Sequence, residues 1–290
     1  MLAASVLLLS LAAAPADDGG RRLLDEATAR YRALQSSEAA RLYEQYLARY
    51  PDRADVRFYL GAALFNLNQL EAAAEQARRA LELDGNYARA YALLGRVHTE
   101  QKDWRLAEEA YQTALRLDGQ DRDTWYFLGR CYYEENRFKP ALEAFQRALS
   151  LKAEYSRTYE NLALTYEALS QYGAAEKAYR RAIELAGSHY RPFFAYGVFL
   201  YKQMRTEESL LMLQKSVQAD PNAAEARFRL GTVLLRMGRL EAAAAQTERA
   251  LDLARECRFR YQLIRIYIQQ GRMAEADEQA RQIRGCETHR

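Results

Sequence analysis

The chain has 290 residues, of which 28% are charged and 49% hydrophobic, and its formal net charge is +3. So small a net charge argues against a broad basic surface for nucleic acid or for an anionic membrane. Six of the 42 basic residues are Lys. This excess of Arg, together with abundant Ala, is typical of proteins from GC-rich bacterial genomes.

The first sixteen residues differ in character from the rest of the chain. Residues 2–14 form a compact apolar run, which leads into Ala14-Pro15-Ala16 and then into two aspartates. The run is short for a bilayer span, and its small-residue ending is typical of a secretory cleavage site. We therefore expect residues 1–16 to be a signal peptide and the mature protein to be exported, periplasmic or extracellular, with no transmembrane span. An uncleaved anchor or a misplaced start is the alternative.

Beyond this segment, tiny residues recur with a period of 34. The series consists of Gly61, Gly95, Gly129, Gly197 and Gly231, and Ala163 fills its one vacant place. Within each period the apolar residues are spaced by three and four, which is the helical spacing. Each period therefore predicts a pair of helices, and so small a unit buries its apolar face only by stacking on its neighbours.

The glycines predict close packing between the two helices of a pair. Gly inside a helix is less favourable than Ala by about 1 kcal/mol, so several in phase need a compensating contact. A tiny residue on the contact face lets the facing helix insert an aromatic or Leu side chain.

These positions together resemble a known repeat. The residues that carry the resemblance in the best-matching unit are Trp125, Leu128, Gly129, Tyr132, Ala141, Phe145 and Ala148. Their order is similar to that of the tetratricopeptide repeat family. The resemblance implies an all-α fold, a right-handed superhelical solenoid of tandem helix-turn-helix repeats. We expect a single solenoid over 17–290 with about eight repeats: 20–53 (degenerate), 54–87, 88–121, 122–155, 156–189, 190–223, 224–256 and a closing repeat 257–290.

The cysteines predict one disulfide. Cys257 begins the first helix of the closing repeat and Cys286 falls at the end of its second helix, and antiparallel helices bring these two ends side by side. A bond there would contribute about 3–4 kcal/mol in the chain-entropy model, and export would provide an oxidising compartment. Two reduced thiols are the alternative. Cys131 lies among core positions of its repeat and is expected to be a buried apolar residue.

The sequence offers no candidate catalytic residues. The histidines, His98, His189 and His289, have no partners at metal-ligand or catalytic spacing, and no phosphate-binding loop or nucleophile motif occurs. Adjacent carboxylates such as Glu108-Glu109 point in different directions on a helix, which is typical of a solvated face. We therefore expect no enzyme activity, no cofactor and no metal.

The resemblance implies that the first helix of each repeat lines a concave groove. The groove residues expected from it are Phe58, Phe65, Arg96, Tyr126, Arg130, Tyr133, Phe194, Tyr201, Phe228, Tyr261 and Arg265. Exposed aromatic rings and arginines dominate the energetics of many interfaces. Half-burial of some of these rings between neighbouring helices is the alternative.

The leading functional hypothesis is a non-catalytic scaffold that binds a protein or peptide partner in this groove. The residue set with which related repeats bind acidic chaperone tails is missing, because Tyr126 and Arg130 stand where Lys and Asn would be. A glycan-binding component of cell-envelope polysaccharide assembly and an accessory subunit of a larger enzyme remain as alternatives. Nucleic acid is not an expected partner.

Overall fold

The computed structural model describes residues 17–283, and across these residues it contains sixteen α-helices and no β-strand. The all-α repeat fold expected from the sequence is therefore confirmed. The proposed signal peptide, residues 1–16, and Cys286 of the expected disulfide lie outside the described residues. The pairing of Cys257 with Cys286 stays a prediction.

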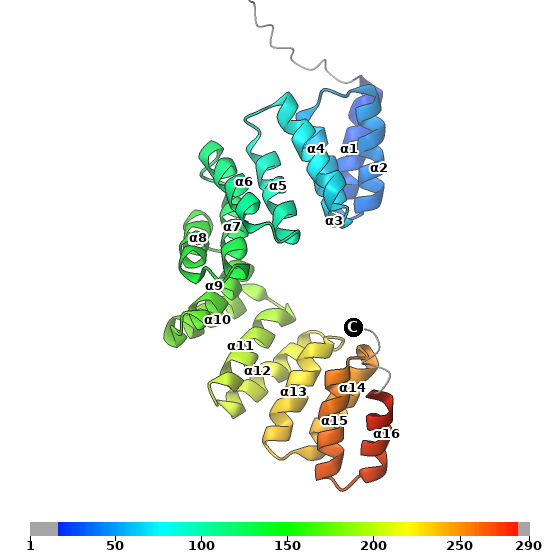
Figure 1. Cartoon of the computed structure of the whole chain (residues 1–290), viewed down its shortest axis with the longest axis vertical. Helices are drawn as coiled ribbons and strands as arrows, with labels where there is room; N and C mark the ends of the chain where they lie inside the picture. The colour runs from blue at the N-terminus through cyan, green and yellow to red at the C-terminus, as the bar shows by residue number, and fades with distance from the viewer. Residues whose placement is uncertain (1–16, 284–290) are drawn as a thin grey trace, which may run out of the picture. The chain divides into compact units, whose positions relative to one another are not determined.

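The described residues form two compact units, 17–153 and 154–283, which are treated one at a time (Figure 1). The single solenoid expected over 17–290 stays a prediction. The first unit contains α1 (Asp18–Arg32), α2 (Ser36–Arg49), α3 (Ala54–Asn66), α4 (Leu70–Leu83), α5 (Ala88–Glu100), α6 (Trp104–Leu117), α7 (Arg122–Glu134) and α8 (Phe138–Leu151). The second contains α9 (Ser156–Ala168), α10 (Tyr172–Ala186), α11 (Tyr190–Lys202), α12 (Thr206–Ala219), α13 (Ala224–Arg236), α14 (Leu240–Leu253), α15 (Cys257–Gln269) and α16 (Met273–Ile283).

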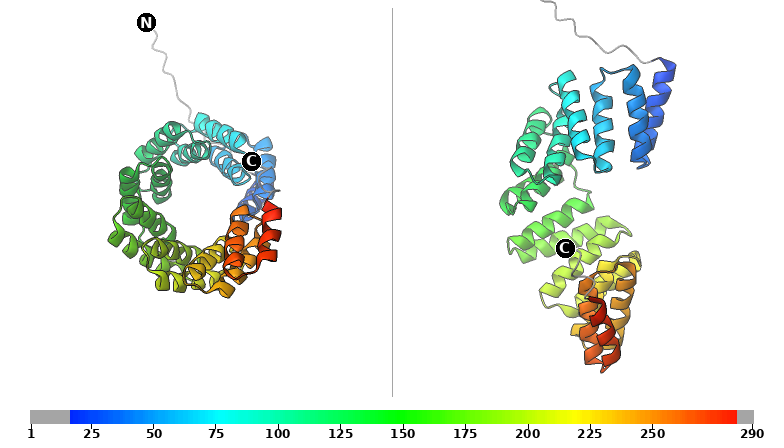
Figure 2. Two further views of the ribbon diagram at one scale, coloured as in Figure 1. Left: turned by 60° about the horizontal axis from the view of Figure 1, so that its bottom comes forward. Right: turned by 45° about the vertical axis from the view of Figure 1, so that its right-hand side comes forward.

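Within each unit the helices pack as successive antiparallel pairs, as both views of Figure 2 show. The glycines lie where the two helices of a pair approach each other. A Cβ atom on Gly95 would lie 2.6 Å from the ring of Tyr111, and one on Gly129 would lie 2.7 Å from the ring of Phe145. The prediction that tiny residues admit a large side chain of the facing helix is confirmed at Gly95, Gly129 and Gly197, the last of which faces Leu213. At Gly61 the nearest side chain is Leu93 of the next pair, and at Gly231 it is the small Thr247.

The turn inside each helix pair has its own repeated feature, which the sequence reading missed. One residue in each of these turns has a positive φ of 60–73°. These residues are Leu34, Asn68, Lys102, Asn136, Ser170, Met204, Gly238 and Gly271. The left-handed conformation ends the first helix and reverses the chain, and it is strained for residues other than Gly.

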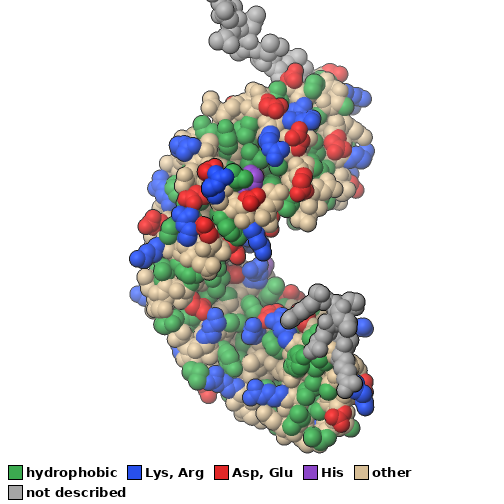
Figure 3. Space-filling view, viewed as in Figure 1, with side chains coloured by type: hydrophobic (Ala, Val, Ile, Leu, Met, Phe, Trp, Pro, Cys, Tyr) green, Lys and Arg blue, Asp and Glu red, His purple; other side chains and the backbone are tan. Residues whose placement is uncertain are grey.

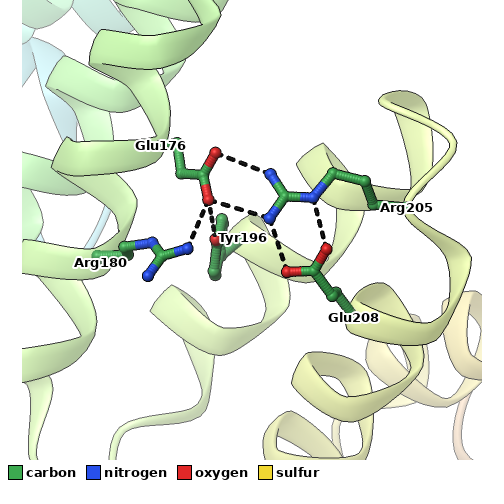
Figure 4. Close-up of polar contacts among 5 residues, drawn as sticks. All are labelled: Glu176, Arg180, Tyr196, Arg205 and Glu208. Atoms are coloured by element: carbon green, nitrogen blue, oxygen red, sulfur yellow. Dashed lines mark hydrogen bonds and ion pairs between the residues drawn. The ribbon is translucent and has the colours of Figure 1, made fainter.

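Partly buried ion clusters join successive pairs. The carboxylate of Glu176 on α10 accepts hydrogen bonds from Tyr196 on α11 and from Arg205, which precedes α12 (Figure 4). In the first unit, Glu108 on α6 likewise accepts from Tyr132 and Arg137. The solvated position expected of Glu108 is wrong, because its side chain is 22% exposed and paired.

Candidate functional site

The expected groove residues lie on first helices that contact one another within each unit. In the first unit α5 contacts both α3 and α7, and in the second α11 contacts α9 and α13, while α13 contacts α15. The first unit carries Phe58, Phe65, Arg96, Tyr126, Arg130 and Tyr133, and the second carries Phe194, Tyr201, Phe228, Tyr261 and Arg265.

Tyr126 does not offer the exposed ring expected of it. Its side chain is 6% exposed and contacts the rings of Phe127 and Phe145. Phe127, the next residue, is half-buried and contacts Arg96 instead. Tyr126 is therefore a packing residue, and Phe127 is a contact residue that the sequence reading missed.

The second unit has a pocket of about 520 Å³ on its first helices α11, α13 and α15. It brings together four of the expected residues, Tyr201, Phe228, Tyr261 and Arg265. The remaining lining residues are Thr232, Leu235, Arg236, Arg258 and Gln262. Arg236 follows the inward position of Leu235 by one residue, so its long side chain brings it to the pocket. Arg258 precedes the inward position of Tyr261 by three residues, which places the two on one face of α15.

The charges of this pocket are unevenly balanced. Arg258 forms ion pairs with Glu225, at 2.5 Å, and with Glu256, at 2.6 Å. These acceptors raise the pKa of Arg258, with Glu256 as the main cause. Arg236 and Arg265 are exposed and form no ion pair within residues 17–283. Two guanidinium groups of the pocket thus have no carboxylate partner in the described part of the chain.

The aromatic side chains of the pocket are placed beside these cations. Arg236 lies 5.0 Å from the ring centre of Tyr201, and Arg258 lies 5.3 Å from that of Phe228. The ring of Tyr261 is 52% exposed. In Figure 3 the surface of the second unit shows hydrophobic side chains with Lys and Arg side chains among them.

Phe194 lies in a neighbouring pocket of about 590 Å³, formed by α9, α11 and the start of α13. Two acidic side chains of this pocket are already paired: Glu160 with Arg191 at 3.3 Å, and Glu167 with Lys202 at 2.5 Å. Asp220 and Glu225 also line this pocket, so carboxylates outnumber cations in its lining.

In the first unit, arginines stack on the expected phenylalanines. Arg96 lies 4.1 Å from the ring centre of Phe65, and Arg89 lies 4.5 Å from that of Phe58. Arg96 and Arg130 line a hollow of about 50 Å³. Tyr133 is half-buried and packs edge-on against Phe138 at 5.5 Å.

Residues 17–283 contain no cluster of three or more His, Cys, Asp or Glu side chains able to hold a metal ion. Among the helices of the same residues, none is long and apolar enough to cross a membrane.

Comparison with known families agrees with this architecture. Models described as tetratricopeptide repeats match residues 24–88, 92–156, 156–189, 200–256 and 228–284. The chain belongs to the tetratricopeptide repeat family. Proteins of this family generally bind protein or peptide partners, and the fold is typically that of a non-catalytic scaffold. No match is found among curated proteins.

Several solved structures resemble this tetratricopeptide repeat protein in fold. The APC/C hetero-tetramer Cut9-Hcn1 has a TM-score of 0.70 and 16% identity, and the match covers 83% of this chain and 48% of that one. PilF of Pseudomonas aeruginosa has a TM-score of 0.62 and 23% identity over 69% of this chain and 91% of its own. YrrB, described as a TPR protein with an unusual peptide-binding site, has a TM-score of 0.50 and 24% identity over 63% and 95%. At these identities the likeness shows the fold alone.

Proposed function

We propose that this tetratricopeptide repeat protein is a non-catalytic scaffold that binds a segment of a partner polypeptide in the pocket formed by α11, α13 and α15. The observation that carries the proposal is the combination, in one 520 Å³ pocket, of aromatic rings with two arginines that have no carboxylate partner among the described residues. A volume of this order is typical of ligand-binding pockets.

The chemistry of the pocket indicates the kind of segment that it binds. Tyr201, Phe228 and Tyr261 offer apolar area at low rotamer cost, and Arg236 and Arg265 offer planar forks of N–H donors for carboxylates. A segment that places an Asp or Glu beside an aromatic or aliphatic side chain satisfies both. The partner is therefore expected to be acidic at its binding segment, with apolar residues close by.

The test is a selection from a displayed library of random peptides, carried out in parallel on the wild-type protein and on an Arg236→Ala/Arg265→Ala variant. We expect the wild type alone to enrich peptides with acidic and apolar residues in adjacent positions. The best such peptide should lose at least tenfold in affinity on Tyr261→Ala or on the double variant. Arg249→Ala, which removes an exposed arginine of α14 outside the pocket, should bind as the wild type does.

Equal enrichment by the wild type and by the double variant would overturn the proposal. An array of oligosaccharides probed with the same proteins distinguishes glycan binding from peptide binding. Binding of sugars that stack on Tyr201 and Tyr261 would depend on these rings and not on the arginines. Saturable binding of an oligosaccharide without peptide enrichment would favour that alternative.

We also propose that the protein works after export, on the basis of the apolar run and the Ala14-Pro15-Ala16 ending. The full-length chain, expressed in a bacterium and recovered from the periplasmic fraction, is expected to begin at Asp17. Recovery of an intact Met1 terminus in the cytoplasmic fraction would contradict this.

A further inference from the structure

Arg96, near the middle of α5, is held between two aromatic rings of the first unit. Its guanidinium carbon lies 4.1 Å from the ring centre of Phe65 on α3 and 4.8 Å from that of Phe127 on α7. Contacts on two sides restrict the guanidinium to one place, so little rotamer freedom is left to lose on binding a ligand.

This guanidinium has no polar partner among residues 17–283: it forms neither a hydrogen bond nor an ion pair there. Arg130 on α7, which lines the same hollow, forms none within these residues either. Several other arginines of the unit have a carboxylate partner. Arg53, for example, is paired with Asp55 at 2.7 Å, and Arg137 with Glu108 at 2.6 Å.

A partly buried charge without an ion-pair partner is unfavourable, since water solvates it poorly and no carboxylate lies within ion-pair distance. Burial is the main cause that lowers the pKa of Arg96, and the neighbouring charge of Arg130 acts in the same direction. Glu100 lines the hollow but lies beyond ion-pair distance of either arginine. An anion placed between the two guanidinium groups would relieve both effects.

The size of the hollow restricts what enters it. Its volume is about 50 Å³, about a tenth of that of the pocket in the second unit. So small a hollow suits the head of a carboxylate better than a large aromatic side chain. Thr99 and Tyr111 also line the hollow, but their hydroxyls already bond to each other at 3.2 Å, so the two arginines are the main donors.

We propose that Arg96 and Arg130 form a second binding site, in the first unit, for a single carboxylate presented by an extended polypeptide. The proposal rests on the proposed function only in taking the ligand to be a polypeptide, and its residues lie outside the pocket of the second unit. In this site the guanidinium of Arg96, which its two ring contacts hold in place, binds the carboxylate. Arg130 supplies a second positive charge that contacts the same carboxylate.

The experiment titrates the full chain with three matched peptides at constant ionic strength: acetyl-Gly-Glu-Gly-amide, its Gln analogue and its phosphoserine analogue. The readout is the tryptophan emission and the thermal midpoint that it reports, because both tryptophans of the chain, Trp104 and Trp125, lie in the first unit. We expect a saturable response to the Glu peptide and none to the Gln peptide.

Arg96→Gln and Arg130→Gln should each weaken the response to the Glu peptide at least fivefold. The matched control is Arg116→Gln, an exposed arginine of α6 that has no carboxylate partner within residues 17–283. This variant and Arg236→Ala/Arg265→Ala should both respond as the wild type does. If Arg96→Gln fails to fold, Arg130→Gln still tests the site.

Equal responses to the Glu and Gln peptides would overturn the proposal, and so would a response that survives both glutamine variants. A stronger response to the phosphoserine peptide would overturn the carboxylate assignment in favour of a phosphate. A response that disappears with Arg236→Ala/Arg265→Ala would place binding in the second unit. The peptide selection can fail at the pocket of the second unit while this titration succeeds. That result would overturn the proposed function but would still support the site at Arg96 and Arg130.

Discussion

Arg205 contacts the carboxylate of Glu176, which lies 29 residues earlier in the chain, with 2.7 Å between Nη1 and Oε2 (Figure 4). The same spacing separates Glu108 from Arg137 in the first unit, where the corresponding distance is 2.6 Å. In both places the carboxylate comes from the second helix of one repeat and the arginine from the turn of the next. These contacts fix the register of successive helix pairs, in addition to the apolar packing.

The pH dependence of stability should show the contribution of Glu176. Its hydrogen bond from Arg205, with further ones from Arg180 and Tyr196, lowers the pKa of this carboxyl to about 2. The unfolded chain titrates near about 4.3, so the stabilisation is present above that pH and is lost as the pH falls towards 2. We expect Glu176→Gln to lower the free energy of unfolding at pH 7 by about 1–2 kcal/mol.

This difference between wild type and Glu176→Gln should shrink between pH 4 and pH 2, which thermal unfolding followed by circular dichroism can measure. Other carboxylates titrate in the same range, but they do so in both proteins and cancel in the difference. The control is Glu207→Gln. Glu207 is an exposed acid in the first turn of α12, next to Glu208, and it has no ion pair among the described residues, so its replacement should have little effect. A difference that stays constant down to pH 2 would contradict the assignment.

The close approach of paired helices predicts a large effect from one added methyl group. Gly129→Ala would place Cβ 2.7 Å from the ring of Phe145, which is fully buried and has little room to move. Overpacking of this kind destabilises by about 1–3 kcal/mol. Gly173→Ala, on α10, has no atom within 4 Å of the new Cβ and should leave stability unchanged or slightly higher. Urea unfolding of the two variants compares them directly, and equal midpoints would refute the packing argument.

The contacts of Gly95 and Gly129 were predictable because each glycine and its aromatic partner lie within one repeat. The period fixes which helix face is buried, and the residue size on that face then indicates how closely the neighbour approaches. This reasoning correctly anticipated the contacts of Gly95 and Gly129. It also led to the four expected residues that the pocket of the second unit brings together, namely Tyr201, Phe228, Tyr261 and Arg265.

The same reasoning failed where the outcome depends on a side chain of another helix. Tyr126 holds an inward position in the repeat pattern, yet it is 6% exposed because it packs on Phe145. Its neighbour Phe127 contacts Arg96 in its place. Glu108 looks solvated on its own helix, because its partner Arg137 belongs to the next repeat. The recurrence of a Glu and an Arg 29 residues apart was visible in the sequence and could have indicated the ion clusters.

A turn residue offers a way to raise stability. Lys102 is exposed and has a φ of 62°, in the position that Gly238 and Gly271 occupy in later repeats. A non-Gly residue in this left-handed conformation is strained by about 1–2 kcal/mol, and part of the gain from Gly is offset by the greater freedom of the unfolded chain. We expect Lys102→Gly to raise the free energy of unfolding by about 0.5–1 kcal/mol.

The reverse change, Gly238→Lys, should lower stability by a similar amount, since no atom lies within 4 Å of its new Cβ and strain is the main effect. Thermal midpoints of the two variants and the wild type give the comparison. A Lys102→Gly variant less stable than the wild type would show that the backbone strain at this turn is smaller than the entropy that Gly adds.

The thiol of Cys131 should be unreactive until the first unit unfolds. The residue is fully buried, and burial raises the pKa of its thiol to about 11. Since the thiolate is the nucleophile, alkylation by iodoacetamide at pH 8 is expected to be at least a hundredfold slower than for an unfolded chain.

Cys131→Ser should remove the slow labelling, which would assign that labelling to Cys131. Mass spectrometry of a native time course checks the rate, and Gly129→Ala should accelerate labelling by loosening the helix pair around Phe145. Rapid alkylation of Cys131 in the folded wild type would show instead that α7 opens locally, without loss of the unit.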